Sequence, residues 1–365
     1  KFDMKWEEAN SYFIFGYVDE QQNKVSKAIK EYSQALEILK DLSDERSIKD
    51  YARILINCGN ILRENLYFNN ALKFYEMAFT TADEYDFSKR LAKIHFNRIL
   101  TYKGVKSYSA AIEETRSLYH IAINNNYDKN RFHSINQLGI IFRSINYQNG
   151  AEKCYESYVE NALDTYNGKD LLGISFNNIA SLKFSNSNNF HLIESLYKSA
   201  EKSYLESNNA SDHKISRNLF VLYKNLTWLA ANFNNYTKGV EYGNKSLRYY
   251  KFVDLKPSTI QIFDHLSQLS RLNGDYERAD YYSTIYKGEY KKFRKQELGQ
   301  LSRLHLEGIQ MDAIVERFGE EKEKENSLGL SNEINIILVI LVLSLIVLSI
   351  YLSKVYKIIS QLNVH

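Results

Sequence analysis

The sequence has little that would interrupt or cross-link a helical chain. Its 365 residues include one proline, 15 glycines and two cysteines. Because proline and glycine break helices and build flexible linkers, their scarcity excludes a long loose linker. Two cysteines cannot make the disulfide framework of a small secreted scaffold. We expect Cys58 and Cys154 to be free thiols on apolar stripes.

No charge of either sign dominates, and no catalytic signature is present. Lysine and arginine number 47 and aspartate and glutamate 44, which gives a net charge of +3. Nucleic-acid binding needs a clustered basic face, which this balance does not indicate. The sequence has no glycine-rich phosphate loop, no nucleophile elbow and no histidine spacing typical of a metal site. We therefore expect a binding protein rather than an enzyme, with no cofactor or metal.

What the sequence does contain is a repeat. From Leu55 to Ala78, apolar residues recur at helical spacing on two successive segments, which indicates a helical hairpin. One position of the second segment returns every 40 to 46 residues, and it is small in most copies. This series is Ala28, Ala71, Ala111, Ala151, Ile193, Gly239 and Ala279. Such a period is typical of stacked hairpins that bury their apolar faces against one another.

The first segments carry a matching series, and turns separate the two segments of a copy. The matching residues are Gly16, Gly59, Ile99, Gly139, Ala180, Thr227 and Ser267. Asparagine and glycine tolerate the left-handed conformation that ends a helix. We therefore expect turns at Asn69-Asn70, Gln148-Asn149-Gly150, Asn188-Asn189, Asn234-Asn235 and Asn273-Gly274-Asp275.

The pattern resembles the tetratricopeptide repeat family over roughly residues 10 to 290. Leu138-Gly139 with Phe142, Ala151 and Tyr155 matches the family's signature of a small residue and an aromatic on the first helix, then alanine and an aromatic on the second. The usual tryptophan and the repeat-ending proline are missing, and the period is longer than the commonest 34 residues. The resemblance implies an all-α fold: a right-handed superhelical solenoid of about seven hairpins in residues 1–289. It also implies a concave groove that binds a peptide or protein segment.

A series of amides indicates where that groove would lie. The residue before the large apolar residue of each first helix is Asn57, Asn97, Gln137, Asn178, Asn225 or His265. A side-chain amide can donate to and accept from a peptide unit, and in the family such asparagines hold ligand backbone. The alternative is that these amides tie neighbouring helices together. The other candidate groove residues are Asn60, Arg63, Asn136, Arg143, Asn177, Lys224, Trp228 and Arg271.

The C-terminal part has a different composition. Residues 334–353 form a run of 20 without a charge or a helix breaker, which at ~1.5 Å per residue spans ~30 Å, the thickness of a bilayer core. We expect a single transmembrane helix there, followed by a short tail at 354–365. Residues 290–333 are expected to form a charged helix, which either caps the solenoid or acts as a stalk through which two copies dimerise.

These observations support two hypotheses. The first is a membrane-anchored receptor whose groove binds a peptide or protein segment, similar to the sensory half of bacterial regulators, with the repeats periplasmic. The second is a tail-anchored adaptor that assembles proteins on the cytosolic side of a membrane. Lysines flank the expected span equally on both sides, so the positive-inside rule does not choose between them. The N-terminus shows no signal peptide and no initiator methionine, so we expect a processed product or a fragment.

Overall fold

The computed structural model describes residues 2–22, 24–165, 169–207 and 213–298. The chain divides into two units, 1–307 and 308–365, and every described residue belongs to the first. The predicted span, the predicted tail and most of the predicted stalk lie outside the described residues, whereas 290–298 are helical. Within the described ranges, no helix is both long and apolar enough to cross a bilayer.

The regular structure in these ranges is helical throughout. One short 3-10 helix, η1 (Tyr250–Phe252), precedes the last long hairpin. The α-helices are α1 (Phe2–Gln21), α2 (Val25–Leu39), α3 (Glu45–Glu64), α4 (Phe68–Glu84), α5 (Ser88–Gly104), α6 (Tyr108–Asn124), α7 (Asp128–Ser144), α8 (Gln148–Thr165), α9 (Lys169–Asn186), α10 (Phe190–Leu205), α11 (His213–Asn232), α12 (Tyr236–Leu247) and α13 (Pro257–Leu272), with a further helix at 276–298.

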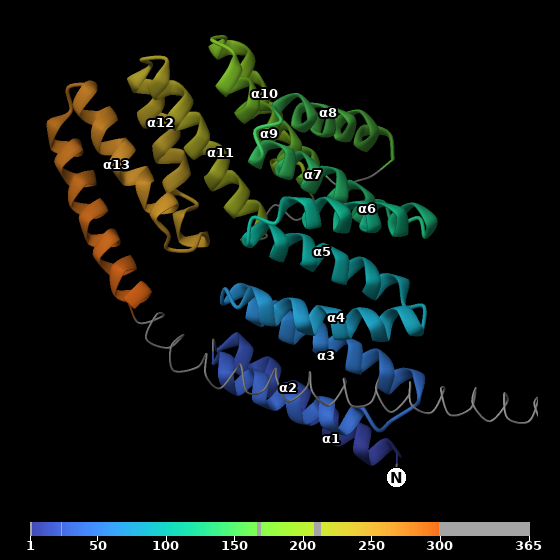
Figure 1. The fold of residues 1–365 in the computed structure, drawn as a ribbon. Coiled ribbons are helices and arrows are strands. Elements are labelled where there is room, and N and C mark those ends of the chain that lie inside the picture. Colours follow the sequence, from blue (N-terminus) through green and yellow to red (C-terminus); the bar gives the residue numbers. More distant parts are fainter. Residues whose placement is uncertain (1, 23, 166–168, 208–212, 299–365) are drawn as a thin grey trace, which may run out of the picture. The chain divides into compact units, whose positions relative to one another are not determined.

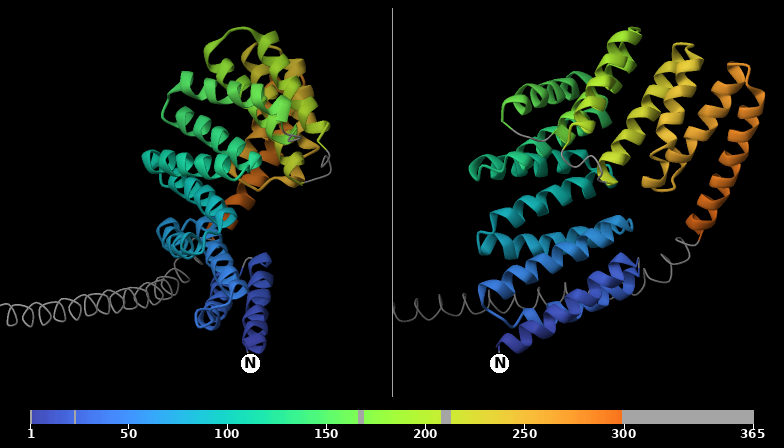
Figure 2. Two further views of the ribbon diagram at one scale, coloured as in Figure 1. Left: turned by 90° about the vertical axis from the view of Figure 1, so that its right-hand side faces the viewer. Right: turned by 180° about the vertical axis from the view of Figure 1, so that it is seen from behind.

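The helices pair in the order that the repeat predicts. Each odd-numbered helix from α1 to α11 packs against the helix that follows it, and that helix packs in turn against the next odd-numbered one. α13 is joined to the last helix by the Ser267 hydroxyl, which donates to the Ala279 carbonyl oxygen at 2.7 Å. Figures 1 and 2 show the hairpins following one another in chain order. The described residues thus form an all-helical repeat solenoid of seven hairpins.

At one repeat position of three hairpins, a glycine of the first helix lies directly against a tyrosine ring of the second. A Cβ atom at Gly139 would lie 2.5 Å from the ring of Tyr155, far closer than two carbon atoms can approach. The same contact joins Gly16 to Tyr32 and Gly59 to Tyr75. The three tyrosine side chains are fully buried. Glycine is needed here because the ring occupies the space of its missing side chain.

Other hairpins fill the space between their two helices with residues of other sizes. At the equivalent positions, α5 carries Ile99 and α6 carries Thr115, both buried. The pair α9 and α10 combines Ala180 with Tyr197, which are again both buried. A larger residue on the first helix is thus matched by a smaller one on the second in the α5–α6 hairpin. Core packing conserves volume in this way because both overpacking and empty space are unfavourable.

The turns from α3 to α8 share one geometry. A residue with positive φ, between 51° and 69°, occurs at every twentieth position: Leu66, Asp86, Lys106, Asn126 and Asn146. In each turn the N–H of the residue after this one donates to the carbonyl oxygen of the residue five positions before the donor, at 2.8 Å. This is the Schellman ending of a helix. Because its hydrogen bonds impose the left-handed conformation, residues other than asparagine and glycine occupy it, at some cost in free energy.

Two predicted turns are wrong by about three residues. Asn69-Asn70 and Gln148-Asn149-Gly150 lie in the first turns of α4 and α8, and the chain reverses before them, at Leu66 and Asn146. The turns predicted at 188–189, 234–235 and 273–275 are confirmed, and the side chains of Asn189 and Asn235 cap α10 and α12.

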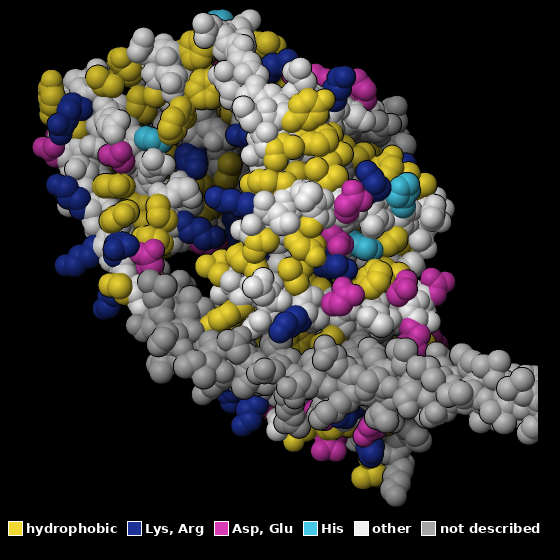
Figure 3. Space-filling model, in the orientation of Figure 1, with side chains coloured by type: hydrophobic (Ala, Val, Ile, Leu, Met, Phe, Trp, Pro, Cys, Tyr) yellow, Lys and Arg dark blue, Asp and Glu magenta, His cyan; other side chains and the backbone are white. Residues whose placement is uncertain are grey.

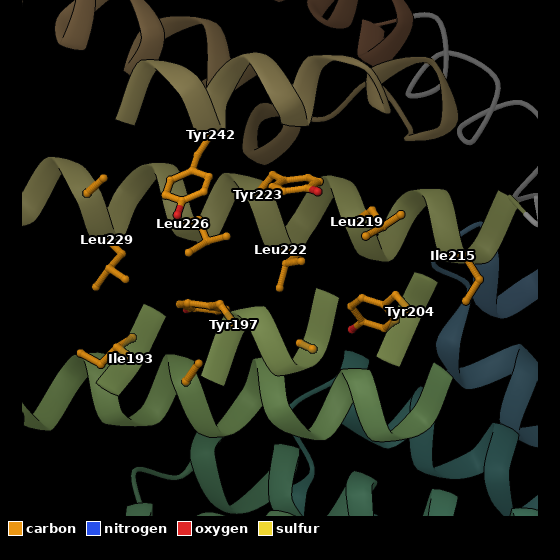
Figure 4. Packing of buried hydrophobic residues seen from close by; sticks show 13 residues of the cluster. Ile193, Tyr197, Tyr204, Ile215, Leu219, Leu222, Tyr223, Leu226, Leu229 and Tyr242 are labelled. Atoms are coloured by element: carbon orange, nitrogen blue, oxygen red, sulfur yellow. The ribbon is translucent and has the colours of Figure 1, made fainter. Parts of the chain in front are cut away.

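The hairpins are fused by buried clusters that span several helices. One such cluster links α9, α10, α11 and α12. Figure 4 shows Tyr197 of α10 beneath Leu222 and Leu226 of α11, and Tyr204 of α10 beneath Leu219. Each of these side chains is at most 2% exposed. Burial of one such side chain contributes about 1.5–3 kcal/mol, so this contact holds successive hairpins together.

We predict that the large–small residue pair of the α5–α6 hairpin can replace the glycine–tyrosine pair of the α7–α8 hairpin. Gly139→Ile should lower the free energy of unfolding by about 1–3 kcal/mol, because the new side chain overlaps Tyr155. Adding Tyr155→Thr should recover part of that loss, since the pair then copies Ile99 and Thr115. Tyr155→Thr alone should destabilise by leaving a cavity. Urea unfolding of all three variants, followed by circular dichroism, measures the coupling energy between residues 139 and 155. If the two single losses in the free energy of unfolding simply add in the double variant, the two side chains do not share one space.

Candidate functional site

The first helices of successive hairpins lie close together and form one face. α1 packs against α3, α3 against α5, α5 against α7, α9 against α11 and α11 against α13, in addition to the contacts within hairpins. Contacts of this extent between successive second helices do not occur among the described residues. Because the first helices are the closer set, their side is the inner one, and we call it the first-helix face. Figure 3 shows the molecule hollowed, with lysine and arginine side chains at the wall of the hollow.

A ladder of amides crosses this face from α7 to α11. Asn178 of α9 donates from Nδ2 to Oδ1 of Asn136 on α7 at 3.3 Å. Asn225 of α11 donates from Nδ2 to Oδ1 of Asn177 on α9 at 3.2 Å. The amides therefore do tie neighbouring hairpins together. Each bond uses one polar atom of each amide, which leaves the other polar atom for a further partner.

The amides nearer the N-terminus have different surroundings. Asn60 accepts a hydrogen bond from the Tyr75 hydroxyl at 2.9 Å, and Asn57 lies beside the Tyr32 hydroxyl. Asn97 is only 7% exposed, and its Nδ2 has no hydrogen-bond partner among the described residues. A buried donor without a partner is unfavourable, so Asn97 is the member of the series whose bonding is least complete.

Two lysines flank the ladder and hydrogen-bond to neutral oxygen atoms. Lys103 of α5 donates from Nζ to Oε1 of Gln137 at 2.6 Å, and Gln137 is the neighbour of Asn136. Lys224, the neighbour of Asn225, donates to the Ser258 carbonyl oxygen at 3.1 Å. Burial lowers the pKa of Lys103 to about 8 and also lowers the pKa of Lys224. The cause is desolvation of an ammonium group that has no carboxylate nearby.

An aromatic pair lies beside Lys224. The Trp228 ring meets the His265 ring edge-on at 4.9 Å between centroids, and Trp228 is 46% exposed. Nδ1 of His265 has no hydrogen-bond partner among the described residues. Burial is the main cause that lowers the pKa of His265, and the charge of Lys224 adds to it. A half-exposed indole beside a cation is a surface that favours contact with another molecule.

The three predicted arginines are placed differently from one another. Arg63 lies 3.0 Å from the carboxylate of its neighbour Glu64, and Arg271 lies 3.2 Å from Asp280 of the last helix. Arg143 is exposed at the end of α7 and has no ion pair with a described residue. Of the three arginines, Arg143 is therefore the one without an ion pair to a described residue.

The structure thus gathers part of the predicted set and separates the rest. Asn136 with Asn178 and Asn177 with Asn225 form two hydrogen-bonded pairs that meet at adjacent residues of α9, and Gln137 extends the set toward α5. The sequence reasoning missed Lys103, together with Arg90 and Lys93 on the same helix. A signal was present, because α5 carries the five cations Lys89, Arg90, Lys93, Arg98 and Lys103 and no carboxylate. Among the described residues, no group of histidine, cysteine or acidic side chains could hold a metal ion.

Solved structures share this arrangement of hairpins at low sequence identity. Aspartyl phosphate phosphatase F from Bacillus subtilis matches with a TM-score of 0.55 and 15% identity, over 79% of this chain and 71% of that chain. A Signal Transduction ATPase with Numerous Domains protein with a tetratricopeptide repeat sensor, from Pyrococcus horikoshii, matches with 0.57 and 14%, over 82% of this chain and 44% of that chain. The chain has a tetratricopeptide-type helical repeat fold.

A third match contains a bound factor. A Rap protein complexed with competence and sporulation factor matches with a TM-score of 0.51 and 15% identity, over 79% of this chain and 76% of that chain. At such identities the likeness establishes the tetratricopeptide-type fold alone. No family model and no curated protein matches the sequence.

We predict that Lys103 makes stability depend on pH. Its pKa is about 8 in the folded chain and ~10.4 when unfolded, so between these values the unfolded chain binds more protons. The contribution of this group to the free energy of unfolding therefore rises with pH, by about 1–2 kcal/mol after allowance for solvent screening.

Lys103→Met should accordingly be more stable than the wild type at pH 7, and its advantage should shrink toward pH 10. Urea unfolding at each pH measures the difference. Lys73→Met, at an exposed position of α4, is the matched control and should show no such trend. A difference between Lys103→Met and wild type that stays constant with pH would refute the assignment.

Proposed function

We propose that this chain is a binding module that holds an extended peptide or protein segment along the first-helix face. The observation that carries the proposal is the amide ladder. It offers donors and acceptors from three successive first helices, α7, α9 and α11, on the first-helix face. An extended segment has unpaired backbone N–H and C=O groups at regular intervals, which such amides can satisfy. The tetratricopeptide-type match that holds competence and sporulation factor supports this use of the fold.

We further propose that the module is anchored to a membrane by residues 334–353 and serves as the sensory part of a bacterial signalling regulator, with its repeats periplasmic. Support for the anchor is the apolar run itself, which has the length of a bilayer span. A homodimer through residues 290–333 would bring two such modules together at the membrane surface. The second candidate is a cytosolic adaptor with the same anchor, which the equal lysine content on both sides of the run leaves open.

The ladder is tested by selection of a displayed library of random nonapeptides on the full chain in detergent micelles. We expect Asn178→Leu with Asn225→Leu to weaken binding of the enriched peptides at least about tenfold, because each substitution removes polar groups without changing side-chain size much. Asn69→Leu, an exposed asparagine on a second helix, is the matched control. Thermal unfolding of the variants reports whether the fold survives. Equal binding by the wild type and a folded double variant would refute the ladder as the site.

Orientation is tested separately, by protease digestion of cells that express the full chain. We expect the repeats to be cleaved once the outer barrier is opened and while the inner membrane remains intact. Cleavage only after the inner membrane is permeabilised would instead support the cytosolic adaptor. A periplasmic protein and a cytosolic protein, detected in the same samples, serve as controls for the two barriers.

A further inference from the structure

The first helices around the ladder are rich in cations and nearly free of carboxylates. α5 has five lysines and arginines and no acidic residue, and α11 has Lys214, Arg217 and Lys224 and no acidic residue. The second helices have the opposite balance in places. α8 carries Glu152, Glu156 and Glu160 against the single cation Lys153. Positive charge is therefore concentrated on α5 and α11, although the whole chain is almost neutral.

Some of these cations are neutralised inside the fold. Arg98 lies 3.1 Å from Glu114 and 3.4 Å from Glu76, and Lys214 lies 2.8 Å from Asp170. Arg217 lies 3.9 Å from Asp254. The others have no ion pair with any described residue, and they are Lys89, Arg90, Lys93, Lys103 and Lys224. For Arg90 and Lys93, burial lowers the pKa, and the charge of Arg53 lowers it further.

Lys103 and Lys224 stand out because of where they lie. Each is adjacent to an end of the amide ladder, through Gln137 at one end and next to Asn225 at the other. Each donates to an uncharged oxygen, and both side chains are only partly exposed. An ammonium group removed from water without a counter-ion is unfavourable, and a carboxylate placed against it forms a short, charge-assisted hydrogen bond. The two positions are therefore suited to receive negative charge from outside the chain.

Resting on the proposed peptide site, we propose that the segment bound along the first-helix face is acidic, with one carboxylate on Lys103 and a second on Lys224. The amides between the two lysines hold the intervening backbone. α5 and α11 are three first-helix spacings apart, and packed helices are about 8–10 Å apart, so the two carboxylates lie roughly 24–30 Å apart. At about 3.3 Å per extended residue, this corresponds to about seven to nine residues along the ligand.

The observations favour a peptide over a polyanion. Nucleic acid and anionic lipid surfaces are bound by many exposed cations that together neutralise a dense row of phosphates. Here the two lysines are half-buried, stand apart and flank uncharged amides. This pattern matches a chain with isolated negative side chains and a hydrogen-bonding backbone.

The test uses a displayed library of random dodecapeptides on the full chain in detergent micelles, because a nonapeptide is too short to reach both lysines over the whole expected range. We expect the enriched peptides to carry aspartate or glutamate at two separated positions. Lys103→Met and Lys224→Met should each abolish the enrichment of acidic residues at one of the two positions and weaken binding of the wild-type peptides about tenfold. Lys103→Arg and Lys224→Arg should keep the preference. Lys73→Met is the matched control on a second helix and should change nothing.

The outcomes separate the two proposals. Enrichment of neutral or basic peptides would overturn the acidic preference and leave peptide binding intact. Failure to enrich any peptide would overturn both. A single-stranded oligonucleotide and phosphatidylserine vesicles are measured in parallel. If either binds more tightly than the peptides and is lost in Lys103→Met, the ligand is a polyanion and the proposal is wrong.

Discussion

The contact on which the solenoid depends is that between the two helices of one hairpin, where a buried side chain of one fills the space left by the other. In three hairpins this is a tyrosine ring against a glycine, as for Gly139 and Tyr155. A helix pair of this size cannot bury its own apolar surface, so each hairpin needs the next. The close approach within hairpins therefore fixes the thickness of the unit, and the buried clusters between hairpins fix how units stack.

The same stacking produces the candidate site. Because α9 and α11 pack against one another, their polar side chains reach across from hairpin to hairpin, as Asn225 does to Asn177. The amides thus serve the fold and leave atoms for a ligand at the same time. The charges of the neighbouring lysines are not used by the fold in this way, since neither Lys103 nor Lys224 has a carboxylate partner among the described residues. Each donates instead to a neutral oxygen, so its positive charge is left for the proposed acidic ligand.

Much of the repeat fold was predictable from the sequence, and the errors of that prediction have a physical cause. The period located all seven hairpins, because small and apolar residues recur at positions where helices touch. Two turns were misplaced because asparagine pairs suggested them, whereas the chain reverses at Leu66 and Asn146. The Schellman hydrogen bonds impose a left-handed conformation on leucine, which no local preference indicates. The bonds of the amide ladder were also not predictable in detail, since they join residues more than 40 positions apart.

The sequence by itself determined the hairpin period, the pairing of small with aromatic residues and the near balance of charge. These are local or periodic properties, which side-chain spacing along a helix is enough to reveal. Only the tertiary structure decided which cations are neutralised. Arg98 and Lys103 lie five residues apart on one helix, but Arg98 meets Glu114 of α6, whereas Lys103 meets Gln137 of α7. Partners of a charge are set by the neighbouring helices that desolvate it, and those are known only once the hairpins are stacked.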